Sequence, residues 1–207
     1  MFTGNHHTRQ FCQSDRPGVL KQEENMTKCA FKKWLLFPVI LSLLTVFPAL
    51  QGVCGEANAD YEATVAKWTS YKDVYNWLEN NFDYDYGRKG RYGKEPLSPA
   101  EMFRLKKGAC YDSANFVIDA LNKINPQYKA RAVFIKNKLG PPHHWVTAFT
   151  ADGNLFVMDY GTSAVWGAMR GIHGPYKLLG DYEDFLFSLR VKGFSVDNVM
   201  YKDINLR

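Results

Sequence analysis

The 207-residue chain is long enough for one ordinary domain with some length left over. Its composition, 46% hydrophobic, 23% charged and 15% aromatic, is typical of a globular protein that needs neither disulfides nor a structural metal for its core. The formal net charge is +5, but no run of basic residues is longer than two, so no nucleic-acid partner is predicted.

The N-terminal segment is predicted to lie outside that domain. Three lysines precede an apolar run over residues 34–50, and small residues follow it, which is the order of a secretory signal peptide. We therefore expect residues 26–59 to be a signal peptide, and the polar residues 1–25 to be a disordered over-extension of the start. The domain is then residues 60–207, and it is secreted or periplasmic.

Two alternatives stay open for this segment. The apolar run could remain uncleaved as a membrane anchor, although its 17 residues are short of the about 20 that a span needs. Lipid attachment at Cys54 is the other alternative, and the preceding Gln-Gly-Val is a poor match to such sites. After cleavage only Cys110 of the four cysteines remains, so the domain cannot form an internal disulfide.

Helical patterns come first in the chain. Residues 63–82 carry apolar side chains three and four apart, which predicts one amphipathic helix or two short ones. The glycine-rich, aromatic segment 83–96 is predicted to be an exposed loop that is long enough to border a site. Ser98, followed by proline and then glutamate three residues later, starts a short helix that we expect to end at Gly108.

A second helix is predicted to begin at Cys110, since apolar residues then repeat at helical intervals until Asn125-Pro126. The small residues Gly108 and Ala109 before the cysteine suit the approach of a substrate backbone. After this helix the pattern changes to that of strands: ARAVFIKN, HHWVTAFTADG and NLFVMDYG.

Asp152-Gly153 is the hairpin signal between the last two strands, and counting back from it places residues 143–146 opposite about 159–162. Beyond Asp159 we expect a glycine-rich loop and a short helix near residues 182–189, and the sequence pattern predicts no particular element for the C-terminal end. His173, in that loop, is predicted to be a surface residue rather than a ligand.

Three groups that together can perform nucleophilic catalysis lie at the ends of these elements. Cys110 begins a helix, where partial positive charge and free N–H groups favour a thiolate and can bind an oxyanion. His143 and His144 begin a strand, and Asp159 ends the next one. Adjacent strand residues face opposite sides, so only one histidine can share a face with Asp159 and Cys110. Each residue alone has an ordinary structural role, but the combination indicates a thiol enzyme.

The segments NNFDYDY, SPAEMFRLK, GACYDSANF, HHWVTAF and VMDYG stand in the order of a known family. Over residues 68–161 the chain resembles the transglutaminase-like superfamily. Members of this superfamily are papain-like thiol enzymes with a Cys-His-Asp triad. The resemblance implies an α+β, papain-like core, in which a central helix carrying Cys110 packs on an antiparallel β-sheet carrying the histidine and Asp159.

The resemblance also implies the roles: Cys110 is the nucleophile, a histidine is the base and Asp159 orients it. The spacing to the Asp-Gly turn favours His144, whereas a family preference for tryptophan two residues after the histidine favours His143. We predict His144 and expect His143 to contact substrate, together with Trp145, Tyr111 and Tyr84.

The implied activity is acyl transfer from peptide or glutamine-side-chain amides through a thioester. Hydrolysis, by a cysteine protease or amidase, is favoured over amine crosslinking, because the chain is a minimal domain. The alternative is a non-catalytic exported binding module, and acetyl transfer from coenzyme A lacks support from a phosphate-binding glycine or basic cluster.

We expect a protein or peptide substrate, no cofactor, and membrane contact only if the N-terminal segment stays uncleaved. No metal is expected, since the triad leaves too few ligands for a closed zinc site. The oligomeric state is left open.

Overall fold

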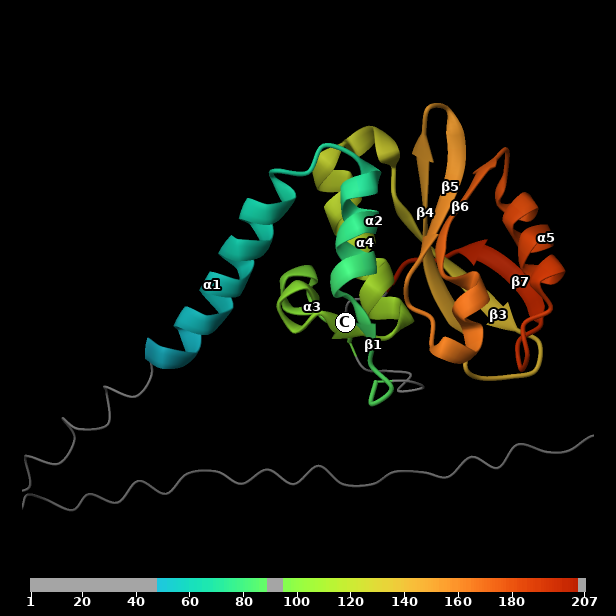
Figure 1. Ribbon diagram of the computed structural model, residues 1–207, viewed down its shortest axis with the longest axis horizontal. Coiled ribbons are helices and arrows are strands. Elements are labelled where there is room, and N and C mark those ends of the chain that lie inside the picture. Colours follow the sequence, from blue (N-terminus) through green and yellow to red (C-terminus); the bar gives the residue numbers. More distant parts are fainter. Residues whose placement is uncertain (1–47, 89–94, 205–207) are drawn as a thin grey trace, which may run out of the picture. The chain divides into compact units, whose positions relative to one another are not determined.

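The computed structural model of the protein describes residues 48–88 and 95–204, with side chains from residue 55 onward (Figure 1). The predicted disordered start and most of the predicted signal peptide lie outside the described residues. Helix α1 (Pro48–Val65) runs across the position of the predicted cleavage, which stays a prediction. Within the described ranges, no helix combines the length and the apolar character that crossing a membrane requires.

The periodic segment 63–82 forms parts of two helices, which confirms the second of the two alternatives. Helix α1 ends at Val65, and helix α2 follows at Tyr71–Asn81. Ser70 stands before α2, and its backbone N–H donates to Asp73 Oδ2 at 2.9 Å. This local hydrogen bond starts a new helix instead of continuing the first.

Helix α3 (Pro99–Leu105) begins as predicted, with Ser98 as its N-cap. It ends earlier than predicted, because Lys106 has a left-handed φ of 54° and closes the helix. The prediction that Gly108 ends this helix is therefore wrong.

The segment 83–96 is not a loop throughout, because it starts with the short strand β1 (Asp83–Tyr84). Strand β1 pairs in parallel with strand β2 (Lys107–Gly108). A Cβ atom at Gly108 would lie 2.7 Å from Cβ of Asp112, which is too close for any side chain. The small size of Gly108 thus makes room for Asp112, a different reason from the substrate access that the sequence suggested.

Five antiparallel strands form the main sheet, in the order β6-β5-β4-β3-β7. The first three along the chain confirm the predicted strands, whereas β6 forms where a loop was predicted and β7 forms at the C-terminal end, for which no element was predicted. The strands are β3 (Arg131–Asn137), β4 (His144–Ala151), β5 (Asn154–Asp159), β6 (Gly171–Tyr176) and β7 (Val196–Tyr201).

The turn Asp152-Gly153 joins β4 to β5, as predicted. Its two residues have φ of 51° and 76°, which is the geometry of a type I′ hairpin. The register pairs Thr147 with Met158, and its continuation places residues 143–146 opposite 159–162. The register counted from the sequence is therefore confirmed.

Helix α4 (Cys110–Ile124) packs along β4, and Thr147 Oγ1 donates to the carbonyl oxygen of Ala114 at 3.0 Å. The 3₁₀ helix η2 (Pro126–Tyr128) continues from the end of α4 and contacts β4 as well. Helix and strand therefore run in the same direction. As a result, Cys110 lies at the end of the sheet where β4 begins.

Two helical layers cover the sheet (Figure 1), so the protein is an α+β fold with its sheet packed between helices. Helices α2 and α4 lie over the face that buries Phe149 and Met158. Helix α5 (Leu179–Leu189), which starts three residues before its predicted position, covers the face that buries Val146 and Val157. The His173 prediction needs correction, because the residue lies in β6 and is half-buried.

Candidate active site

His144 and Asp159 meet where β4 begins and β5 ends, at the end of the hairpin away from its turn. His144 is the first residue of β4 and Asp159 is the last of β5. Their side chains are 1% and 0% exposed, and His144 Nε2 lies 2.7 Å from Asp159 Oδ2. An ionised carboxylate can only accept, so Nε2–H donates to it and the other ring nitrogen, Nδ1, remains for another partner.

That partner is Cys110, whose side chain is hydrogen-bonded to His144. Burial lowers the pKa of His144, but the charge and hydrogen bond of Asp159, followed by those of Cys110, raise it to about 10. The imidazole next to Cys110 is therefore held in its cationic form. Cys110 itself is half-buried.

The first turn of α4 has free backbone donors next to the sulfur. The N–H groups of Asp112 and Ser113 donate to the carbonyl oxygen of Ala109, at 3.1 and 3.0 Å. Among the described residues, no hydrogen-bond partner is seen for the N–H groups of Cys110 and Tyr111. A helix start leaves such donors unpaired, and they are suited to a developing oxyanion.

Asp112 forms hydrogen bonds both within this helix start and to the segment before α3. Its carboxylate is 0% exposed and accepts the N–H groups of Ala109 and Leu97, each at 2.8 Å. It also accepts from Arg88 Nε at 2.7 Å and Arg88 Nη2 at 2.9 Å. The sequence contains a signal for the Ala109 contact, namely an aspartate three residues after the N-cap, but none for the contacts with Leu97 and Arg88.

The structure brings His144, and not His143, against Asp159. The Nδ1 atom of His143 accepts the backbone N–H of Asn137 at 3.1 Å, and its ring lies 5.4 Å from that of Phe134. Trp145 also packs on Phe134, with ring centroids 5.0 Å apart. Two of the predicted substrate contacts thus pack on the same residue of β3, one from just before β4 and one from its second position.

The other two predicted contacts lie on two other elements, Tyr84 on β1 and Tyr111 in the first turn of α4. Tyr84 is paired with Gly108 and its ring contacts that of Tyr86 at 5.1 Å. Tyr111 lies under the guanidinium of Arg88, which is 5.5 Å from its ring centroid. Tyr84 and Tyr111 thus have different aromatic or cationic neighbours from those of His143 and Trp145.

Trp166 was not identified from the sequence. It lies in the 3₁₀ helix η3 (Ala164–Met169), and its ring meets that of His144 edge-on at 5.8 Å. Its other contact is Phe194, at 4.7 Å. Such a ring shields the His144 imidazole from water, but nothing periodic in the glycine-rich segment could have revealed it.

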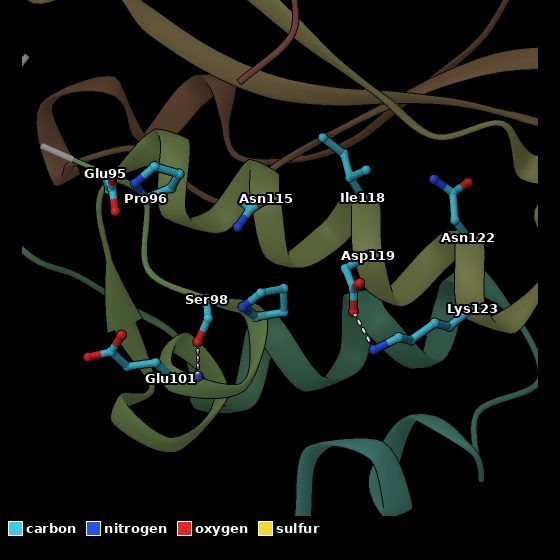
Figure 2. A pocket seen from close by; sticks show the side chains of 10 residues that line it. Glu95, Pro96, Ser98, Glu101, Asn115, Ile118, Asp119, Asn122 and Lys123 are labelled. Atoms are coloured by element: carbon cyan, nitrogen blue, oxygen red, sulfur yellow. Dashed lines mark hydrogen bonds and ion pairs between the residues drawn. The ribbon is translucent and has the colours of Figure 1, made fainter. Parts of the chain in front are cut away.

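A groove with a volume of about 720 Å³ lies between α3 and α4 (Figure 2). Ile118, Asp119 and Lys123 line it from α4, and Ser98 and Glu101 border it from the α3 side. None of the residues around it belongs to the Cys110, His144 and Asp159 group. Within the described ranges, no three acidic, histidine or cysteine side chains are arranged to hold a metal ion.

The transglutaminase-like domain family matches residues 57–166, which is 110 of the 207 residues. No curated protein matches the chain. Among solved structures, LapG of Legionella pneumophila is 16% identical, over 51% of this chain and 62% of LapG, with a TM-score of 0.38. The chain thus spans less than two thirds of that LapG structure.

Calcium-bound LapG of the same organism is 14% identical, over 73% of this chain and 83% of LapG, with a TM-score of 0.42. A candidate cysteine protease from Cytophaga hutchinsonii is 17% identical, over 72% of this chain and 50% of its own length, with a TM-score of 0.36.

Proposed function

The chain belongs to the transglutaminase-like domain family, and from that premise we propose that it is a thiol enzyme that transfers acyl groups from amides through a thioester on Cys110. The observation that carries the proposal is the buried His144–Asp159 pair, 2.7 Å apart, hydrogen-bonded to a partly exposed thiol at a helix start. The arrangement is of the papain-like type.

The proposed reaction has two halves. The Cys110 sulfur attacks the amide carbonyl carbon, a C–S bond forms, and the oxyanion is held by the N–H groups of Cys110 and Tyr111. The C–N bond then breaks as the protonated His144 gives its proton to the leaving nitrogen. In the second half water attacks the thioester while His144 takes a proton, and the thiolate is released.

Asp159 acts on the ring of His144. Its bond to Nε2–H keeps Nδ1 directed at the sulfur and stabilises the imidazolium that both halves use. The four aromatic residues described above, His143, Trp145, Tyr111 and Tyr84, are proposed to contact the substrate. The substrate is a protein or peptide, and hydrolysis of a peptide or glutamine-side-chain amide is favoured over amine crosslinking.

We further propose that the protein acts outside the cytoplasm, as a secreted or periplasmic enzyme. The support is the signal-peptide order of residues 26–59.

The first test is the alkylation of Cys110 by iodoacetamide between pH 6 and 9, quantified on the Cys110 peptide by mass spectrometry. When the pH is lowered from 9 to 6, the thiolate fraction of a free thiol, and with it the alkylation rate, falls more than about 100-fold. We expect the alkylation rate in the wild-type chain to fall less than about tenfold over the same change. His144→Gln should restore the steep fall in rate, whereas His173→Gln, which changes a histidine outside the site, should not.

The second test uses casein as a general substrate. New N-termini would identify a protease, ammonia release an amidase, and incorporation of a fluorescent amine a crosslinking enzyme. If Cys110 labels as a free thiol and casein is unchanged, the chain is a binding module and the proposal fails.

A further inference from the structure

Gly161, two residues after Asp159, lies against the backbone of Cys110. A Cβ atom at position 161 would be 2.2 Å from Cys110 Cα, 2.8 Å from its Cβ and 3.1 Å from its nitrogen. Cβ atoms make ordinary van der Waals contacts at 3.4 to 4 Å. No residue with a side chain can therefore occupy position 161 unless one of the two segments moves.

The reason for glycine here is steric. Five other described glycines have positive φ, and Gly161 is not among them. An L residue could thus adopt its backbone conformation without strain. What excludes a side chain is the contact with Cys110.

The contact comes from the way β4 and β5 separate. Their pairing ends at Thr147 and Met158, although its continuation would place His144 opposite Gly161. Both residues contact Cys110 instead, His144 through its hydrogen bond and Gly161 through its backbone. The start of α4 therefore touches both strand ends where they no longer pair.

We propose that Gly161 is a positioning residue: by having no side chain, it lets the β5 end approach the α4 start closely enough for Cys110 to reach His144. This inference rests on the proposed function, since it concerns the geometry of the same thiol and imidazole. Asp159 and Gly161 then both act from the end of β5. Asp159 orients the ring of His144, and Gly161 leaves room for Cys110 to lie beside that ring.

The size of the effect follows from the contact distance. A methyl group at position 161 must move Cys110 by about 1.2 Å or more to lengthen the 2.2 Å contact to 3.4 Å. A displacement of about 1 Å between reacting groups can reduce a rate about 100-fold. We expect Gly161→Ala to lower acyl transfer by that factor.

The decisive readout is the pH profile of Cys110 alkylation, because a structural role alone would not change it. In Gly161→Ala the sulfur should lose its imidazolium partner, so labelling at pH 6 should fall at least tenfold while labelling at pH 9 stays near the wild-type rate. The control is Gly167→Ala, since a Cβ at Gly167 meets no atom within 4 Å and its φ is not positive.

Circular dichroism and urea unfolding of the same full-length chains show whether the variants are folded at the labelling temperature. A folded Gly161→Ala chain with the wild-type pH profile would overturn the inference. A chain that does not fold would also overturn it, since the glycine would then serve the core and not the site. A free-thiol profile in the wild-type chain itself would instead reject the proposed function.

Discussion

Arg88→Ala should destabilise the fold strongly, although Arg88 comes from an irregular segment. The carboxylate of Asp112 is 0% exposed, and Arg88 supplies two of its four hydrogen bonds as well as its counter-charge. Removing one partner of a buried ion pair leaves an uncompensated charge and costs about 3–5 kcal/mol. Because two backbone N–H groups still bind Asp112, we expect the low end, about 3 kcal/mol.

Urea unfolding measures this loss. With a slope of about 2 kcal/mol per M for a domain of this size, the midpoint should fall by about 1.5 M. The control is Lys136→Ala, because the Lys136–Asp197 pair has the same 2.7 Å separation, but its side chains are 52% and 37% exposed. An exposed pair contributes about 0–1 kcal/mol.

The two ion pairs have the same N–O distance but differ in burial, so comparing the two variants shows whether burial determines how much a pair contributes to the free energy of unfolding. If Arg88→Ala costs no more than Lys136→Ala, the buried carboxylate is not held by Arg88 in the way described, and the reasoning is refuted. We also expect added salt to weaken the contribution of Lys136 and to leave that of Arg88 nearly unchanged, since buried charges are screened less.

Two further predictions concern the site and its support. The pKa of His144 is raised from 6.5 to about 10, so the stabilising contribution of its proton is fully present below pH 6.5 and is lost as the pH rises through 10. In the proposed thiolate–imidazolium pair the folded chain holds one proton on His144, whereas the unfolded chain holds one on Cys110 up to about pH 8.5, so the free energy of unfolding should fall by up to about 1.4 kcal/mol per pH unit only between about pH 8.5 and 10. Urea unfolding at about pH 8.5, 9 and 9.5 should show this slope in the wild-type chain and a smaller one in Asp159→Asn, and equal slopes would contradict it. Thr147→Val removes a buried hydrogen bond of 3.0 Å to Ala114 and should cost about 1 kcal/mol in thermal unfolding. It should leave the alkylation profile of Cys110 unchanged, and an altered profile would show that this bond also positions the sulfur.

The parts of the fold that sequence reasoning predicted are governed by neighbours in the chain. The helix over residues 110–124 has a clear apolar repeat, and its end is set by Asn125-Pro126. The Asp152-Gly153 turn dictates the register of the hairpin, because a two-residue turn leaves no other pairing. His144 could be preferred over His143 for the same reason, since the turn decides which of the two shares a face with Asp159.

The parts that were missed depend on partners far along the chain. Strand β7 pairs with β3, where Val133 lies beside Tyr201, and its own residues show no clean alternation of buried and exposed side chains. Strand β6 contains two glycines and a proline, which are typical of a loop. Both are edge strands, so each pairs with a neighbour on one side alone. That pairing, and not the sequence of the segment itself, stabilises each of them as a strand.

Gly108 and Gly161 show why a candidate site can be named from sequence before its geometry can. The sequence places Gly108 at a helix end and Gly161 in a loop, and neither placement requires a close contact. In the structure neither has positive φ, and each lacks a side chain because another residue fills that space: Asp112 for Gly108 and Cys110 for Gly161. The chemical groups of the site lie at element ends, where spacing predicts them. The distances between those groups also depend on contacts such as that of Gly161 with Cys110, about fifty residues earlier in the chain, which leaves no pattern in the sequence.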